Sequence, residues 1–286
     1  MTSKFYDAFV SMMRGMFNTR DRAEHTRKRK IVSHTFSAQS VGEFEQYIHH
    51  NLEEFVQQWD QISLIGGLGS YSRIDALHWF NYLAFDIIGD LAFGQPFGMI
   101  RKGKDIAEVK KHKDAPPTYA PAIEVLNRRG EVSATLGCWP ELKPYAKWSP
   151  GLSYSQQHEL AHILTPCPPD PFFSKGIRAV ENLAGIAIAR VSQRLEDGNP
   201  DGRVDLLQRL VEGKDENGQP LGRTELTVEA LTQLIAGSDT TSNTSCALLY
   251  HVLKHPRVIS KLQEELDANI SENEKVPLYK QVKDLP

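Results

Sequence analysis

Apolar residues recur along most of this chain at the three- and four-residue spacing of helices. In residues 40–62 the positions that follow this spacing are Phe44, Ile48, Leu52, Phe55, Val56 and Trp59. Residues 74–93 are apolar and aromatic almost throughout, which predicts a buried helix that ends at Gly94. Large aromatic side chains in such a run normally fill a core, so we assign them to packing.

Weaker versions of the same pattern predict further helices at residues 21–37, 119–128, 172–195, 204–210 and 256–267. Pro116-Pro117 opens the second of these helices, and an irregular, proline-rich stretch follows it as far as Pro171. Turn residues at 197–202 and a polar loop at 213–222 separate the later helices. Because strand patterns are weak throughout, we predict an all-α fold.

The longest predicted helix, residues 227–254, has an unusual pattern of its own. Its two ends are apolar, but residues 237–245 are all small or hydrogen-bonding. Thr224 and Thr227 are candidate N-caps, and Pro256 stops the helix. At 1.5 Å per residue the helix would be roughly 42 Å long. Unpaired polar groups are costly inside a protein, so a polar window halfway along suggests a ligand or chemistry at that point.

The polar window offers two kinds of chemistry. Ala236 and Gly237 leave room for something flat to lie against the backbone. Asp239 stands beside Thr240, and an acid next to a hydroxyl can act as a proton relay. The alternative is a helix–helix crossing that uses small residues, with Asp239 paired to a base, and spacing alone does not decide between the two.

A second candidate site lies near the start of the chain. His25 and Arg29 are four residues apart and therefore share one face of a helix. Arg27, Lys28 and Lys30 add a basic surface that suits an acidic protein partner. A solvated charge run, or a cluster of the nuclear-import type, is the alternative interpretation.

The letters A-G-S-D-T-T at residues 236–241 resemble the oxygen-binding helix of the haem-thiolate monooxygenases, the cytochromes P450. The resemblance implies that Ala236 and Gly237 border the haem and that Asp239 and Thr240 deliver protons to dioxygen, with Thr240 also at the haem face. His25 and Arg29 are similar to the pair on this family's C helix that binds a haem propionate, a pairing that suits a guanidinium. The implied cofactors are haem iron and, through a separate reductase, NADPH.

Four longer stretches, residues 17–30, 79–94, 125–137 and 235–247, also resemble one branch of that family, the fungal benzoate para-hydroxylases. This resemblance implies a monooxygenase that inserts one oxygen atom from O2 into a small aromatic acid. It also implies NADPH-cytochrome P450 reductase as the partner, and an endoplasmic reticulum membrane location for the full-length protein.

The family pattern further implies that this chain, residues 1–286, is a partial cytochrome P450 domain. It ends where the family's K helix begins, so we expect the Glu-x-x-Arg pair and the haem-ligating cysteine loop to lie outside it. Cys138, Cys167 and Cys246 do not lie in such a loop, so we assign no axial metal ligand. We expect a partial gene model or a decayed copy that does not hydroxylate benzoate alone. A non-catalytic helical remnant is the alternative.

The amino-acid composition argues against several classes of protein. Hydrophobic residues make up 40% and charged residues 24%, and the net charge is −3, which argues against a nucleic-acid binder. No run of 18 apolar residues occurs, so we expect no transmembrane segment and a cytoplasmic chain. Three cysteines without regular spacing predict a reduced, intracellular protein rather than a disulfide framework.

One rival motif is H-E-x-x-H at His158, Glu159 and His162, which is typical of zinc peptidases, with Glu181 as a possible third ligand. Nearby prolines would make its helix very short. Residues 150–169 lie between two family-like stretches and have a foreign, proline-rich composition. We therefore predict that they are an insertion, such as a translated intron. Spliced transcripts that join the two flanks would support this, and transcripts that contain the segment would contradict it.

Overall fold

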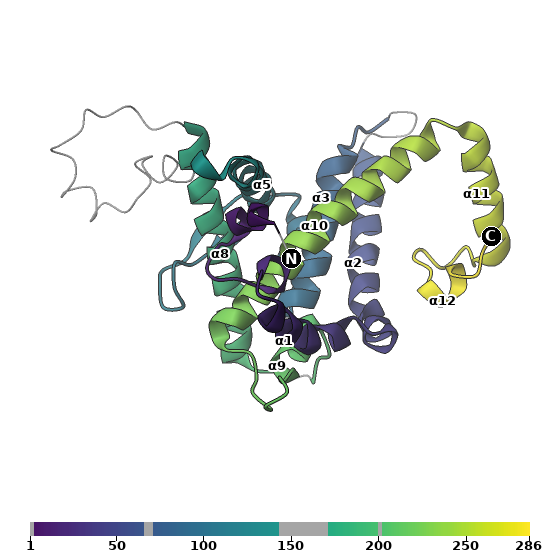
Figure 1. Cartoon of the computed structure of the whole chain (residues 1–286). Helices are drawn as coiled ribbons and strands as arrows, with labels where there is room; N and C mark the ends of the chain where they lie inside the picture. The colour runs from purple at the N-terminus through teal and green to yellow at the C-terminus, as the bar shows by residue number, and fades with distance from the viewer. Residues whose placement is uncertain (1–2, 66–70, 143–170, 200–201) are drawn as a thin grey trace, which may run out of the picture. The chain divides into compact units, whose positions relative to one another are not determined.

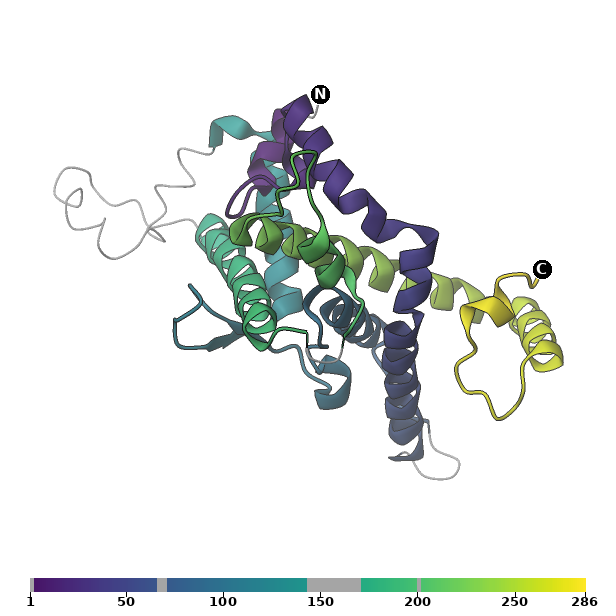
Figure 2. The same ribbon diagram turned by 90° about the horizontal axis from the view of Figure 1, so that it is seen from below.

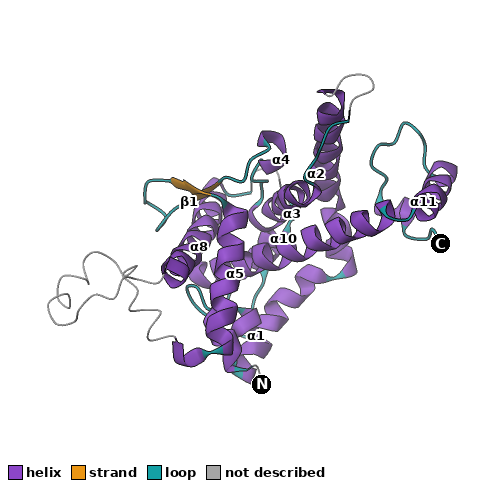
Figure 3. Cartoon of the chain, turned by 90° about the horizontal axis from the view of Figure 1, so that it is seen from above, coloured by secondary structure: helices purple, strands orange, loops and turns teal. Residues whose placement is uncertain are grey.

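The structure is a computed structural model that describes residues 3–65, 71–142, 171–199 and 202–286. Helices dominate this part of the chain (Figure 3), which confirms the all-α prediction. The α-helices are α1 (Arg22–Ser33), α2 (Ala38–Ile65), α3 (Ala76–Phe93), α4 (Met99–Lys102), α5 (Ala122–Cys138), α8 (Pro171–Asp197), α9 (Leu206–Glu212), α10 (Arg223–Leu253), α11 (Pro256–Asn269) and α12 (Tyr279–Val282). Short 3-10 helices are η1 (Lys4–Phe9), η2 (Met16–Asn18), η3 (His34–Phe36) and η4 (Pro140–Leu142), and the strands are β1 (Ala107–Val109) and β2 (Thr118–Ala120).

The chain divides into two compact units. Unit 1 comprises Met1–Val32, Ile106–Asn199 and Leu210–Thr232. Unit 2 comprises Ser33–Asp105, Pro200–Arg209 and Gln233–Pro286. The long helix α10, which Figure 1 shows as one continuous ribbon, begins in unit 1 and ends in unit 2.

In unit 1 the helices α5 and α8 lie side by side (Figure 3). Glycines make this packing close, because a Cβ added at Gly176 would lie 2.1 Å from Val132. The β1–β2 hairpin runs beside α8 (Figure 2), and the Lys110 backbone N–H donates to the Gly185 carbonyl at 3.1 Å. A Cβ at Gly185 would lie 2.5 Å from Val109, so only glycine lets the strand come this near.

The hairpin and the start of α5 correct the sequence-based prediction. Residues 118–120 form a strand rather than the start of a helix, and the helix begins at Ala122. Pro121 explains the difference, because a residue that precedes proline is pushed out of the helical region and into extended backbone. The helix then continues to Cys138, through residues predicted to be irregular, because Val132, Ser133 and Gly137 form a buried face.

In unit 2 the core lies between α2 and α3, which run side by side (Figure 1). The Phe55 ring stacks on Phe80 at a centroid distance of 5.6 Å and touches Trp59 at 4.7 Å. Asp86 of α3 is fully buried and accepts hydrogen bonds from the backbone N–H groups of Met99 and Ile100 at 3.1 and 2.9 Å. It thereby satisfies donors at the start of α4.

An ion pair ties the segment before α9 to this core. The Arg203 guanidinium binds Asp90 Oδ1 at 2.7 Å and Asp205 Oδ2 at 2.8 Å. It also lies 3.7 Å from the centroid of the Tyr47 ring, in a cation–π contact. Burial raises the pKa of Asp90, and the Arg203 charge acts against that shift.

Most of the predicted helices are confirmed with shifted ends. The buried helix α3 ends as predicted at Gly94, whose φ of 83° is a left-handed conformation that glycine adopts easily. Helix α10 begins at Arg223, four residues before the expected start, and α11 runs to Asn269 rather than residue 267.

Among the described residues no helix is both long and apolar enough to cross a membrane.

Candidate functional site

The polar window of α10 lies in unit 2 and has an inner and an outer face. Ser238 and Ser242 are buried, whereas Ala236, Asp239 and Thr240 are exposed. The hydroxyls of Ser238 and Thr240 each donate at 2.7 Å to the carbonyl one turn earlier, that of Leu234 and of Ala236. The window therefore satisfies much of its own hydrogen bonding, which allows a polar stretch inside a helix without external partners.

Gly237 is where α10 comes close to α3. A Cβ added to this glycine would lie 3.0 Å from Ile88 Cδ1 and 3.1 Å from Ile88 Cγ1. The helix-crossing interpretation is therefore correct for Gly237. It is not correct for Asp239, whose carboxylate is exposed and, within the described ranges, accepts only from the Asn243 amide at 3.3 Å.

Asp239 and Thr240 are neighbours on the outer face but do not bond to each other. The Thr240 hydroxyl donates to its own helix, and the Asp239 carboxylate accepts from Asn243. A proton that passes between them would need another group in between. The relay role of this pair stays a prediction.

The outer face of the window fits a flat ligand. Ala236 and Thr240 are one turn apart and both exposed, and their side chains are short. A planar ring system could lie across them without displacing a large side chain. The residues present are thus compatible with the haem that the family resemblance implies.

The second candidate pair lies on α1 in unit 1. His25 is half-buried and Arg29 is exposed, one turn apart on the same helix. In the part of the chain that the structure describes, no carboxylate lies within ion-pair distance of Arg29. Its guanidinium is free to bind an external anion, which suits a propionate.

Of the basic residues predicted to add a surface on α1, Lys30 is exposed, but Lys28 is buried and Arg27 lies partly buried in ion pairs. Lys28 is only 1% exposed, and its ammonium lies 3.1 Å from the Glu225 carboxylate. Arg27 pairs with Glu24 at 2.8 Å and also with Glu225. The hydrogen bonds that Arg27 donates to the Glu24 carboxylate are the main cause that raises the pKa of Arg27. The prediction that Lys28 belongs to a basic surface is therefore wrong. The helix period puts Lys28 on the inner face of α1 with Ile31 and Val32.

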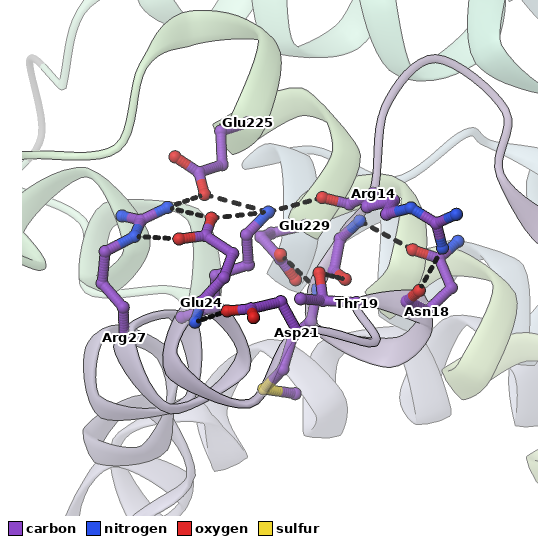
Figure 4. A network of polar contacts seen from close by, with 11 residues as sticks. Arg14, Asn18, Thr19, Asp21, Glu24, Arg27, Glu225 and Glu229 are labelled. Carbon is purple, nitrogen blue, oxygen red and sulfur yellow. Dashed lines mark hydrogen bonds and ion pairs between the residues drawn. The ribbon is translucent and has the colours of Figure 1, made fainter. Parts of the chain in front are cut away.

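Glu229 on α10 is a buried acid that was not predicted as a site residue, because only its place near the helix start marks it in the sequence. Its side chain is fully buried, and one oxygen accepts from the Met16 backbone N–H at 2.7 Å (Figure 4). The other oxygen has no hydrogen-bond partner among the described residues. Burial raises the pKa of this carboxyl.

The rival motif and the proposed insertion, residues 150–169, lie outside the described residues, as does Cys167. Glu181, the suggested third zinc ligand, is exposed on α8. In the described ranges no group of three or more His, Cys, Asp or Glu side chains could hold a metal ion, and Cys138 and Cys246 are free thiols. The zinc interpretation and the insertion both stay untested predictions.

Comparison with known proteins identifies the family. The family model for cytochrome P450 matches residues 2–286. This chain belongs to the cytochrome P450 family, as the A-G-S-D-T-T window and the all-α fold predict.

Comparison with individual members of the family shows which of them the chain resembles. The chain is 60% identical over 290 residues to the benzoate 4-monooxygenase bphA of Aspergillus niger, covering 100% of the chain and 52% of that protein. It is 29% identical over 271 residues to the cytochrome P450 monooxygenase ORF11 of Penicillium roqueforti, covering 92% of the chain and 47% of that protein. It is 26% identical over 243 residues to the trichothecene C-4 hydroxylase of Trichoderma arundinaceum, covering 85% and 41%. The chain thus spans about half the length of the curated relatives it matches.

Proposed function

We propose that the whole protein represented by this chain is a haem-dependent monooxygenase of the benzoate para-hydroxylase type. It would insert one oxygen atom from O2 into a small aromatic acid, with electrons from NADPH delivered by NADPH-cytochrome P450 reductase. The observation that carries this proposal is the 60% identity to a benzoate 4-monooxygenase along the entire chain. The exposed window of α10 supports it, because this window offers small and protic side chains together.

Haem, when bound, supplies the iron at which dioxygen is reduced. Arg29 would hold a propionate, since its guanidinium has no carboxylate partner within the described ranges. His25, one turn away, would add a second polar contact. Ala236 would form part of the surface under the ring, and Gly237 would let α10 lie close to Ile88 behind it.

Thr240 and Asp239 would supply protons. Inserting one oxygen atom and releasing the other as water consumes protons as well as electrons. Asp239 is exposed and can exchange protons with solvent, and the Thr240 hydroxyl stands next to it on the outer face. Because the two groups do not bond to each other directly, the proton would pass through a group held between them.

The proton role has a direct test in the whole, haem-loaded enzyme. We expect Thr240→Ala to lower the amount of product formed per NADPH oxidised by about 100-fold, the lower end of what a positioned proton-transfer group contributes. Thr240→Ser keeps the hydroxyl and should keep most of this yield. Thr241→Ala is the matched control, because Thr241 is the exposed next residue along the helix. An equal loss in both alanine variants would contradict a specific role for Thr240.

The substrate assignment can be tested by exchange of segments. We would replace the matching segment of the Aspergillus niger benzoate 4-monooxygenase with this chain and measure hydroxylation of benzoate with reductase and NADPH. The expected result is 4-hydroxybenzoate. A chimera that folds, gives a thiolate-type carbon monoxide band and leaves benzoate unchanged would contradict the substrate class.

The same spectrum tests this chain by itself. We expect the expressed chain, reduced and supplied with haem, to give no thiolate-type band and no benzoate hydroxylation. A thiolate-type band would identify Cys138, Cys167 or Cys246 as an iron ligand and would contradict that expectation.

We further propose that the whole protein works at the endoplasmic reticulum membrane, where the reductase would meet it. This rests on the family resemblance. Recovery of a tagged whole protein with reductase-containing membranes would support it, and recovery in the soluble fraction would contradict it.

A further inference from the structure

Arg129 on α5 is a buried cation that has no acidic partner among the described residues. Its side chain is 5% exposed. Among the described residues the buried cations are Lys28 and Arg129, and Lys28 has Glu225 beside it. No described carboxylate lies within ion-pair distance of Arg129, whereas its exposed neighbour Arg128 pairs with Glu131 at 2.7 Å.

The surroundings of Arg129 are aromatic rather than charged. Its Nη2 donates to the Phe9 carbonyl at 2.9 Å, and its Cζ lies 5.6 Å from the centroid of the Phe9 ring. Phe9 in turn contacts Phe5 at 5.2 Å, and Tyr6 contacts Phe17 at the same distance. All of these residues belong to unit 1, around η1.

These contacts leave the charge uncompensated. A carbonyl and a ring face attract a cation but do not neutralise it, and the Nε of Arg129 has no hydrogen-bond partner in the described part of the chain. Desolvation lowers the pKa of Arg129 to about 10, so the guanidinium is still charged at pH 7. Burying such an ion without a partner is costly unless an anion arrives to pair with it.

The chemistry that would complete this site is an aromatic carboxylate. A guanidinium binds a carboxylate through two parallel charge-assisted hydrogen bonds, and Nε is still open for one of them. The aromatic side chains of η1 offer edge-to-face or offset contacts to a second ring. A small aromatic acid carries both parts in one molecule.

We propose that Arg129 binds the carboxylate of the aromatic acid substrate, with the substrate ring packed against Phe9 and Phe5 of η1. The inference rests on the proposed function for the class of substrate. Because the Phe9 carbonyl now occupies Nη2, the incoming carboxylate replaces that carbonyl as the acceptor of this hydrogen bond. Arg129 is then a residue that determines specificity for acids over neutral aromatic compounds.

The test compares an acid with its neutral isostere. We would measure the binding of benzoate and of benzamide to the chain by equilibrium dialysis. The unchanged chain is expected to prefer benzoate. Arg129→Met should weaken benzoate binding roughly 10- to 100-fold, the usual effect of losing a hydrogen-bonded charge, and should leave benzamide binding unchanged. Arg128→Met is the matched control, since it removes the same charge from the exposed neighbour.

Stability in the absence of ligand separates a binding role from a structural one. If Arg129 is kept for an anion, Arg129→Met removes an uncompensated buried charge and the variant unfolds at the same or a higher temperature. A purely structural arginine would give a less stable variant with an unchanged preference for benzoate. Circular dichroism checks that the helices remain.

A variant-free measurement covers the case in which Arg129→Met does not fold. Photolabelling the unchanged chain with 4-azidobenzoate should mark peptides from η1 or α5. Excess benzoate should prevent the labelling, and excess benzamide should not. Labelling elsewhere would overturn the inference.

The outcomes keep this inference apart from the proposed function. A folded Arg129→Met variant that still prefers benzoate overturns the role of Arg129 and leaves the monooxygenase proposal standing. Equal binding of benzoate and benzamide by the unchanged chain, or no binding of either, also overturns it. A benzoate-binding chain whose chimera forms no 4-hydroxybenzoate contradicts the proposed reaction but not the carboxylate site.

Discussion

The two halves of α10 have similar helix-forming sequences and opposite surroundings. In the first half Leu226, Ala230 and Leu234 are buried, and Leu234 is 0% exposed. In the second half Leu248 and Leu253 are 65% and 61% exposed. Leucines of the same helix thus differ because other segments pack around one half. A Cβ added to Gly15, for example, would lie 2.9 Å from Val228.

The carboxylates of the two halves differ in the same way, whereas hydroxyls in both halves donate to carbonyls of their own helix. In the first half Glu225 and Glu229 bind groups from other segments, Lys28 and the Met16 backbone. In the second half the Asp239 carboxylate accepts, within the described ranges, only from Asn243 of the same helix. The first half therefore holds the fold together, and the second presents side chains to whatever lies against it.

The largest effect should come from removing core volume in the first half. We expect Leu234→Ala to destabilise the chain by about 2–5 kcal/mol, because the cavity cost adds to the lost burial. Leu248→Ala, in the exposed half, should change the free energy of unfolding by no more than about 0.5 kcal/mol. Urea denaturation of both variants measures the difference, and equal losses would remove the contrast between the halves.

The ion pair of the first half should come next. Glu225→Ala leaves the buried Lys28 ammonium with the Arg14 carbonyl and with the more distant Glu24 carboxylate, at 3.7 Å, so we expect a loss of about 3 kcal/mol, the lower end for a broken buried pair. Glu24→Ala is the control, because Glu24 is more exposed and such pairs contribute up to about 1 kcal/mol. A larger loss for the Glu24 variant would place the main partner of Lys28 on α1 rather than α10.

A smaller effect should depend on pH. Burial raises the pKa of Glu229 above its value in the unfolded chain, so the folded state holds this proton more tightly. The associated stability is present below the unfolded pKa and is lost as the pH rises through the folded pKa. At pH 7, Glu229→Gln should therefore be more stable than the unchanged chain by about 1 kcal/mol, because one carboxylate oxygen of Glu229 has no hydrogen-bond partner among the described residues. At pH 4 the variant should not be more stable than the unchanged chain. Thermal unfolding at both pH values tests this, and a stabilisation that does not change with pH would contradict it.

The smallest effect should come from the polar window. Thr240→Ala removes a hydroxyl that, among the described residues, bonds to a carbonyl of its own helix alone, so we expect a change in the free energy of unfolding within about 0.5 kcal/mol. If the same variant also forms less product per NADPH oxidised, the effect of Thr240 on function is separate from its effect on stability. Unfolding in urea measures the first quantity, and a loss above about 2 kcal/mol would show that the window supports the fold.

Long helices were predictable from the sequence because their signals are local. Apolar periodicity and a stop residue are enough for α3, which ends at Gly94, and for α10, which Pro256 follows. The β1–β2 hairpin was missed because each strand has three residues, too few for an alternating pattern. Pro121 indicates where α5 starts, because a proline pushes the residue before it out of the helical region. The sequence-based prediction placed the helix start before Pro121 instead of after it.

The candidate site was predictable only in part, for a physical reason. The types and spacing of Ala236, Asp239 and Thr240 are properties of one helix and can be read from the chain. The partners of a charged side chain cannot be read from the chain in this way, because they come from distant segments. Lys28 and Arg129 look alike in sequence, as basic residues among other basic residues. Lys28 is paired with a carboxylate inside the fold, whereas Arg129 has no carboxylate partner in the part of the chain that the structure describes.

The contact between Gly237 and Ile88 has a consequence for how this sequence can evolve. The space that one more methyl group would need at position 237 is already taken by the isoleucine, at 3.0 Å. The two positions should therefore change together in related chains, with alanine at one accompanied by valine or a smaller residue at the other. A lineage that keeps the isoleucine can accept alanine at position 237 only if the Ile88 side chain gives way by a few tenths of an ångström. Changes of this surface on the long helix are therefore expected to follow changes on α3.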